Sequence, residues 1–277
     1  IIKHTKKIAI ANKEAIICGW HLMKKNLIKY KTIFIPVDSE HFSIFYALQG
    51  NKISNVDKIY LTASGGPLIN LPKGKFKNVK ISEAINHPNW KMGKKISVDS
   101  ATMMNKVFEI IEAKKIFNLR YDQLDILVHP TSYVHAVIKF NDGMIKIIVH
   151  DTNMRIPIFN SLYDDQQKII KTNDINIDKL NFLNFKKVDK NKFPSIKMIR
   201  KLKNKENLLE TIIVLANDEL VNLFLLKKIN YTDIYILLQK LINMKEFKKI
   251  NQKKPGNVNS IISLNKMVRT KINKIIH

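Results

Sequence analysis

Short apolar runs that end in polar residues constrain this fold more than any other feature of the sequence. Residues 33–37 read IFIPV, a run too short for a helix, and the acidic triplet DSE follows it directly. Such runs are typical of strands buried inside a sheet. We expect further strands at 7–10, 58–63 and 125–128, and helices at 15–29 and 41–48. This alternation of strands and helices predicts an α/β fold.

The region that follows residue 70 is expected to begin as a long loop. Residues 70–95 are polar and predict one short helix near 82–86. Ser100 is a good N-cap residue, and the apolar positions after it predict a helix that ends at about residue 117. Alternating apolar residues on both sides of Asn141-Asp142-Gly143 predict a hairpin of 133–140 and 144–149.

The last third of the sequence predicts a linker followed by a helical bundle. Residues 171–194 are rich in Lys, Asn and Asp and show weak periodicity, as a linker does. Beyond Pro194 the apolar pattern is helical, and Asn230 and Pro255-Gly256 interrupt it. We expect helical segments near 195–204, 207–228, 232–250 and 257–275.

The charge and cysteine content narrow the class of protein. The net charge is +25, but only four of the 48 basic residues are arginine, the side chain that nucleic-acid readers favour. We therefore expect a solvated basic surface, with neither nucleic acid nor a membrane as partner. One cysteine suits a reducing compartment, so we expect a cytoplasmic protein. The first residues lack an initiator Met and a signal-peptide pattern, which suggests a start inside a larger reading frame.

Three carboxylates form a candidate metal site. Asp38 and Glu40 would share one side of an extended backbone, because side chains alternate along a strand. Glu109 has largely apolar neighbours in a predicted helix and is a candidate third ligand. Three carboxylates without a Cys/His cluster suit a hard ion such as Mg²⁺ or Mn²⁺. The alternative is a solvated loop for the pair and a surface position for Glu109.

A second set of residues suits an anion. Ser64-Gly65-Gly66 follows a strand and offers a hydroxyl and backbone N–H groups. Ser100 is predicted at a helix N-terminus, where N–H groups favour a phosphate. Asn105 and Lys106 lie about one turn further along. Each feature alone is also explained by a turn or a cap; together with the carboxylates they indicate a phosphorylated, metal-chelated substrate.

The stretch HPNWKMG at 87–93 has the composition of a lid. Exposed Trp90 and Met92 are unfavourable unless they cover something, and Gly93 could act as a hinge. The alternative is that Trp90 tethers the loop to the core. His129 and His135 are either core histidines or neighbours of a ligand, and the sequence leaves both open.

These residues stand in motifs that resemble one known family, the 1-deoxy-D-xylulose 5-phosphate reductoisomerases. The similarity extends over nearly the whole chain, and its longest block is 87–109. The stretches that carry it are ANKEAIICG (11–19), PVDSEHFSIF (36–45), LTASGGP (61–67), HPNWKMGKKISVDSATMMNK (87–106), HPTSYVHAVIKFNDG (129–143) and MRIPI (154–158).

The resemblance implies a reaction and a set of cofactors. Members of the family use NADPH and a divalent metal (magnesium, manganese or cobalt) to isomerise and reduce 1-deoxy-D-xylulose 5-phosphate. The product is 2-C-methyl-D-erythritol 4-phosphate, an isoprenoid precursor, and the enzyme is expected to be a homodimer. The fold implied is the end of a Rossmann-like NADPH domain (1–37), an α+β catalytic domain with a mostly β dimerisation sheet (38–165), a linker (166–194) and a C-terminal helical bundle (195–277).

The resemblance also assigns roles to individual residues. The metal would be held by Asp38, Glu40 and Glu109. The catalytic group would comprise Lys13, His87 and these three carboxylates. Substrate would contact Lys13, Ser39, Glu40, Ser64, His87, Ser100, Asn105, Lys106 and Glu109. The cofactor would touch Asn12, Glu14 and Gly93, and the lid would contain Trp90 and Met92.

One departure from the family pattern leaves other interpretations open. The chain contains no glycine-rich dinucleotide fingerprint of the G-x-G-x-x-G kind, so the N-terminal part of the cofactor domain is expected to be missing. Alternatives are a metal-dependent aldolase or isomerase that reduces nothing, a partial or eroded form that binds metal and sugar phosphate, and a basic polyanion-binding protein.

Overall fold

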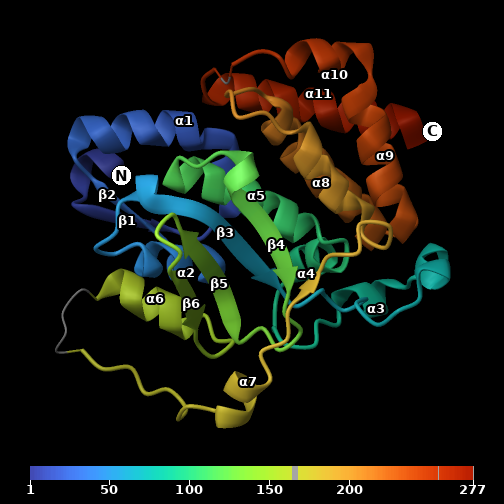
Figure 1. The fold of residues 1–277 in the computed structure, drawn as a ribbon. Coiled ribbons are helices and arrows are strands. Elements are labelled where there is room, and N and C mark those ends of the chain that lie inside the picture. The colour runs from blue at the N-terminus through green and yellow to red at the C-terminus, as the bar shows by residue number, and fades with distance from the viewer. Residues whose placement is uncertain (164–167, 255, 277) are drawn as a thin grey trace.

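The computed structural model describes residues 1–163, 168–254 and 256–276 and has an α/β architecture (Figure 1). At the N-terminus, strands β1 (Lys7–Ile10) and β2 (Ile33–Pro36) form a parallel pair joined by helix α1 (Lys13–Tyr30). These three elements confirm the predicted strand–helix–strand alternation. Within the described ranges, none of the helices combines the length and apolar character that crossing a lipid bilayer requires.

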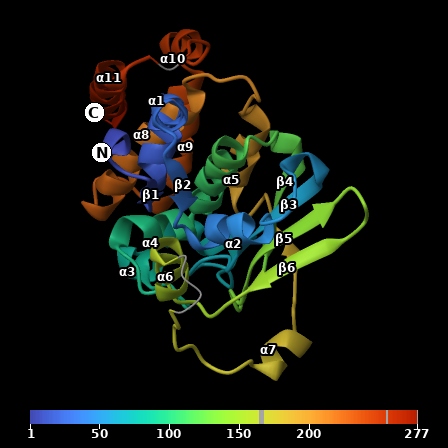
Figure 2. The same cartoon turned by 90° about the vertical axis from the view of Figure 1, so that its left-hand side faces the viewer.

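A mixed five-stranded sheet forms the centre of the molecule. Its strands run in the order β6-β5-β3-β4-β7. β3 (Val56–Ala63) is parallel to β4 (Leu124–Val128) and antiparallel to β5 (Val134–Phe140), which pairs in turn with β6 (Ile145–Val149). The predicted hairpin is therefore confirmed. Figure 2 shows that this hairpin lies at the side of the molecule away from helices α8 and α11.

Helices between the strands carry much of the candidate site. α2 (Ser39–Ala47) packs against β5 and β6, and α5 (Met104–Phe117) packs against β3 and β4. The buried side chains of α5 include Val107, Phe108, Ile110 and Ile111, which join the main hydrophobic core. The short helices of the sheet region are α3 (Ile81–Ile85), α4 (Lys94–Ala101) and α6 (Arg155–Leu162).

The C-terminal segments form a helical layer beside the sheet domain. A 3₁₀ helix (Pro194–Lys201) leads into α8 (Leu209–Leu225), α9 (Tyr231–Asn243), α10 (Lys245–Ile250) and α11 (Val258–Ile276). α8 packs on α9, α11, α1 and α4 and so joins this layer to the rest of the molecule. The predicted helical segment at 232–250 is two helices, because Met244 has an extended backbone between them.

Three predictions about local structure were wrong. Ser100 lies inside α4 and caps no helix; α5 starts after Met103, whose φ of 60° breaks the two helices apart. Asp38 and Glu40 do not alternate along a strand, because α2 begins at this point and Asp38 takes its N-cap position. The region 70–95 contains a 3₁₀ helix (Lys73–Asn78) besides α3.

The predicted linker is only partly a linker. The segment carries α7 (Ile177–Asn181) and extends away from the sheet (Figure 1), but β7 (Lys186–Lys187) then returns to pair with β4. The expected boundary at residue 165 and Pro255 of the expected helix break lie outside the described residues.

Candidate active site

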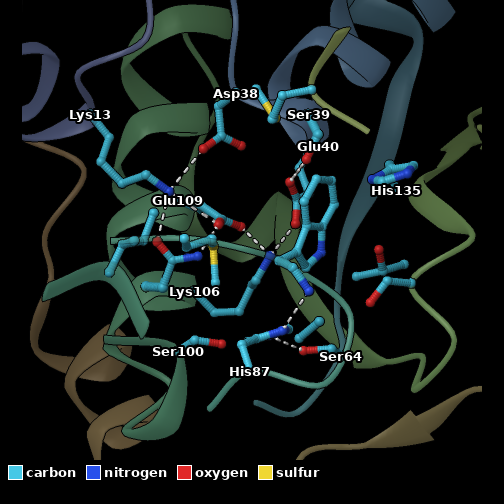
Figure 3. A pocket seen from close by; sticks show the side chains of 18 of the residues that line it. Lys13, Asp38, Ser39, Glu40, Ser64, His87, Ser100, Lys106, Glu109 and His135 are labelled. Carbon is cyan, nitrogen blue, oxygen red and sulfur yellow. Dashed lines mark hydrogen bonds and ion pairs between the residues drawn. The ribbon is translucent and has the colours of Figure 1, made fainter. Parts of the chain in front are cut away.

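A cavity of about 230 Å³ lies where β2, β3, α2, α4 and α5 meet, and the predicted site residues gather around it (Figure 3). Its lining includes Lys13, Asp38, Ser39, Glu40, Ser64, His87, Trp90, Met92, Ser100, Asn105, Lys106 and Glu109. The predicted cofactor residues do not line it. Asn12 caps α1 by accepting from the Ala15 N–H (2.7 Å), Glu14 is paired with Lys95, and Gly93 precedes α4.

The three carboxylates converge as predicted, although for a different reason. Each of Asp38, Glu40 and Glu109 offers an oxygen within 4.8 Å of the others. Asp38 and Glu40 come from the first turn of α2, where a helix N-terminus favours negative charge, and Glu109 projects from α5. Glu109 is buried and the other two are partly buried, and carboxylates this close together and shielded from water require compensating positive charge.

Two buried lysines supply that charge. Lys13 Nζ lies 2.8 Å from Asp38 and 3.2 Å from Glu109, and Lys106 Nζ contacts both Glu40 and Glu109. Burial lowers the pKa of each lysine, but the neighbouring carboxylates outweigh it and raise both pKa values above the usual range. Both ammonium groups therefore stay charged.

The donor set fits a divalent cation, because it consists of the hard carboxylate oxygens that Mg²⁺ and Mn²⁺ prefer. Burial and the neighbouring Glu40 raise the pKa of Glu109, so a positive ion beside these carboxylates would relieve their repulsion. Lys106 contacts one carboxylate oxygen of Glu40 and one of Glu109, two of the three candidate metal ligands. Lys106 and a divalent ion would therefore compete for the same two carboxylates.

A histidine behind the carboxylates connects two of them, and the sequence analysis missed it. His41 Nδ1 lies 3.2 Å from Asp38 Oδ1 and 3.5 Å from Glu112, and its Nε2 donates to the Glu109 carbonyl oxygen at 2.9 Å. Burial lowers the pKa of His41, but Glu112 and Asp38 outweigh this effect and raise it to about 9. The i,i+3 spacings from Asp38 to His41 and from Glu109 to Glu112 were the available signal.

At the other end of the cavity, hydrogen bonds orient the hydroxyl group of Ser64. His87 Nδ1 accepts from the N–H groups of Asn89 (3.1 Å) and Trp90 (3.0 Å), so its Nε2 carries the proton and donates to Ser64 Oγ at 3.0 Å. Ser64 Oγ also accepts from the Gly66 N–H at 3.0 Å. With both acceptor positions filled, the Ser64 O–H proton is left for a ligand in the cavity.

Two further features of this end of the cavity are a neutral His87 side chain and a position at Gly66 that has no room for a larger residue. Burial, aided by Lys106, lowers the pKa of His87 to about 4. Gly66 has a φ of 70°, and a Cβ at this position would collide with the Ser100 carbonyl oxygen. The turn after β3 and the end of α4 therefore approach closely and bring Ser64 and Ser100 to the same end of the cavity.

The two histidines that the sequence left open have different positions. His135 lines the cavity, stacks on His150 at 3.6 Å between ring centroids and meets the edge of Trp90 at 6.2 Å. His129 packs on Phe185, outside the cavity lining, and lies beside the Asn184 carbonyl oxygen. Thr62, Ser132 and Met154 also line the cavity, although the sequence predicted no site role for them.

Comparisons with known proteins agree with these features. Residues 34–117 match the family model described as 1-deoxy-D-xylulose 5-phosphate reductoisomerase C-terminal domain, and 150–271 match DXP reductoisomerase C-terminal domain. The 1-deoxy-D-xylulose 5-phosphate reductoisomerase of Pelagibacter ubique is 59% identical over 99% of this chain, which spans 71% of that protein. The one from Sulfurihydrogenibium sp. is 39% identical over 91% of the chain, which spans 66% of it.

A solved structure of a reductoisomerase is also similar to this chain. A DOX-P reductoisomerase in complex with NADPH, fosmidomycin and magnesium superposes with a TM-score of 0.88 at 31% identity, over 99% of this chain and 71% of that one. The chain therefore belongs to the 1-deoxy-D-xylulose 5-phosphate reductoisomerase family.

Proposed function

We propose that this protein isomerises 1-deoxy-D-xylulose 5-phosphate and reduces it to 2-C-methyl-D-erythritol 4-phosphate, with NADPH as the hydride donor and a divalent metal. One observation carries the proposal: three convergent carboxylates line one end of the cavity, and the hydroxyl-bearing residues Ser64 and Ser100 line the other end. A sugar phosphate has a chelating end and an anionic end, and the cavity matches this division. The relatives' names and the NADPH and magnesium bound by the similar solved structure support the same assignment.

The carboxylate end would bind the metal and the reacting part of the sugar. A divalent ion held by Asp38, Glu40 and Glu109 would supply Lewis-acid chemistry to neighbouring carbonyl and hydroxyl oxygens. Lys13, whose pKa is raised well above the usual range, would donate hydrogen bonds to substrate oxygens as a permanent cation. The hydroxyl of Ser39, directly beside Glu40, would orient the substrate.

The serine end would bind the phosphate. Ser64 offers its free O–H proton, and Ser100 lines the same end of the cavity. Lys106 lies between the two ends (Figure 3), and Asn105 lines the same cavity. Lys106 would turn its ammonium group toward the phosphate when Glu40 and Glu109 hold a metal ion, and Asn105 would donate from its amide.

The lid and the cofactor site flank the cavity. Trp90 and Met92 line it beside His87, so closure of this loop over bound substrate would exclude water. Asn12, Glu14 and Gly93 lie just outside the cavity, on α1 and before α4, and would meet the nicotinamide cofactor there. The Glu14–Lys95 pair joins these two elements.

The remaining features concern the whole protein. The domain boundaries that we propose are 1–37 for cofactor binding, 38–165 for catalysis, 166–194 for the connection and 195–277 for the helical domain. We place the protein in the cytoplasm as a homodimer, with the sheet edge at β6 as the subunit contact. Ile145 and Ile147 are 54% and 44% exposed on that edge strand, an arrangement that favours pairing with another chain.

The direct test is substrate-dependent NADPH oxidation with Mg²⁺, Mn²⁺ or Co²⁺ by the purified full-length protein, with the N-terminal cofactor segment that this chain is expected to lack, combined with identification of the product. Glu109→Gln is expected to lower kcat/KM by at least about a hundredfold, because it removes a charged ligand. Glu206→Gln, at an exposed position, is the matched control. Binding of metal and sugar phosphate without NADPH consumption would favour the non-reducing alternative and overturn the proposal.

A further inference from the structure

A second cavity, of about 290 Å³, lies behind the turn that separates α4 from α5. Its walls come from the 3₁₀ helix Lys73–Asn78, the 3₁₀ helix Pro194–Lys201 and the start of α9. The reductoisomerase chemistry uses none of these elements. The cavity is therefore a separate place in which a ligand could bind.

The interior of this cavity is aromatic. Phe76 packs against Phe193 at 6.0 Å between ring centroids and meets Tyr231 edge-on at 5.7 Å, and all three rings are buried. Ile234, also buried, adds an aliphatic wall. Such a lining favours a flat apolar molecule, since aromatic rings gain from stacked and edge contacts.

The charged residues that line the cavity have one sign, and the Asp189 carboxylate lies outside the lining, where it accepts from the Lys192 backbone N–H. Its charged lining residues are Lys73, Lys77 and Lys192, and no Asp or Glu is found among the described residues that line it. Lys192 Nζ is held over the Phe76 and Phe193 rings, at 5.9 and 5.7 Å from their centroids, by donation to the Ile69 carbonyl oxygen at 2.6 Å. A fixed cation above an aromatic floor, with two exposed lysines at the rim, complements a planar ligand that carries an anionic group.

The two cavities share a wall. Ser100 and Met103 line the catalytic cavity, whereas Thr102 and Met104 line the second one. The backbone of this wall is anchored from the second cavity: Tyr231 OH donates to the Ala101 carbonyl oxygen at 2.7 Å, and Ser195 Oγ donates to the Thr102 carbonyl oxygen. A ligand that shifts Tyr231 or Ser195 would therefore shift Ser100 as well.

We propose that the second cavity binds small aromatic anions, a planar ring system with one carboxylate. We also propose that its occupancy changes the affinity of the catalytic cavity for the phosphorylated substrate. This second part rests on the proposed function, and the first part does not. The coupling acts in both directions, because two sites that influence each other do so by the same factor.

The test uses 2-naphthoate as the probe and the uncharged 2-naphthamide as its matched control, both titrated calorimetrically into the purified protein. Naphthoate is expected to bind about tenfold more tightly than the amide, a difference of about 1.4 kcal/mol. Lys73→Gln combined with Lys77→Gln should remove most of this difference. The exposed pair Lys248→Gln and Lys249→Gln changes the net charge equally and should leave it intact.

Two further variants locate the probe. Thr232→Trp and Gly74→Trp place a large ring at the lining, and an added Cβ at Gly74 meets open space, so this variant should fold. Both should abolish naphthoate binding, whereas Glu109→Gln in the catalytic cavity should not affect it. Loss of binding in Glu109→Gln with retention in both tryptophan variants would overturn the site, as would equal affinity for the amide.

The coupling has its own readout. The Kd of 1-deoxy-D-xylulose 5-phosphate, measured with and without saturating naphthoate, should change by about threefold or more. An unchanged Kd would overturn the coupling while the binding site stands. A protein that binds naphthoate but no sugar phosphate at all would contradict the proposed function rather than the second cavity.

Discussion

Lys106 is the residue for which we propose two roles in the site. Its buried ammonium group contacts Glu40 and Glu109, two of the three candidate metal ligands. Without a metal ion, its single positive charge offsets part of their negative charge. If an ion is bound by these carboxylates, the same ammonium group would be available to the substrate phosphate.

Replacing Lys106 tests this double role. Lys106→Met keeps the length and removes the charge. We expect the protein to lose about ten- to a hundredfold in affinity for the phosphorylated sugar, the value of one charge-assisted hydrogen bond, and little affinity for an unphosphorylated analogue. Mn²⁺ affinity should not fall, because a competitor for the carboxylates is gone. Equal losses for both sugars, measured by calorimetry, would show that Lys106 acts only on the fold.

His135 makes the stability depend on pH. Burial, together with the stacked His150, lowers its pKa to about 3, and Glu40 only partly opposes this while Lys106 adds to it. The unfolded chain, with a histidine pKa of about 6.5, binds more protons below that pH, so the free energy of unfolding falls as the pH drops. Between pH 7 and pH 4 the His135 contribution to this fall should be about 3 kcal/mol.

Urea denaturation at several pH values checks this expectation. His135→Asn should reduce the fall in stability between pH 7 and pH 4, whereas His4→Asn, at an exposed histidine, should leave it unchanged. Identical pH profiles for the wild type and His135→Asn would contradict the account of a buried neutral imidazole.

At the scale of elements, the apolar runs were predicted well because burial leaves a clear pattern. The strand at 58–63 and the Asn141-Asp142-Gly143 hairpin lie where the sequence placed them, and so does the strand at 7–10, although none of its residues is buried. β7 escaped prediction because it consists of two exposed lysines, whose strand character comes only from pairing with β4. Elements without an apolar face leave no periodic signal.

The candidate site was likewise predictable only in part. Its residue types were predictable from the motifs, but the geometry that joins them was not. Ser100 looked like an N-cap because apolar residues follow it, yet the helix break comes at Met103, a residue with no sequence preference for a φ of 60°. The link from His41 to Glu109 spans 68 positions and depends on how α2 packs beside α5.

Helix α1 offers a test at the element scale. Its C-cap, Lys31, is exposed and has φ 54° and ψ 32°, a left-handed conformation that glycine adopts without strain. Lys31→Gly should therefore stabilise the protein by up to about 1 kcal/mol. Lys25→Gly, at an exposed position inside the same helix, should destabilise it by about 1 kcal/mol. Thermal unfolding would contradict the C-cap assignment if both variants lost stability equally.

At the scale of the whole molecule, the sheet edge predicts assembly. If β6 pairs with a second copy, Ile147→Lys should place a charge in the contact and shift sedimentation velocity toward the monomer. Ile262→Lys, at an exposed isoleucine of α11 on the side of the molecule away from this hairpin, should sediment as the wild type does. A wild-type protein that sediments as a monomer at all concentrations would contradict the proposed homodimer.

The proposed function depends on one divalent ion held among three carboxylates of α2 and α5. The most direct measurement is a crystal structure of the protein grown with Mn²⁺, with anomalous scattering recorded at the manganese edge. The account predicts one peak between Asp38, Glu40 and Glu109, with metal–oxygen distances of ~2.0–2.6 Å and the Lys106 ammonium displaced from Glu40. A protein saturated with Mn²⁺ that shows no peak there, with Lys106 still bridging Glu40 and Glu109, would contradict it.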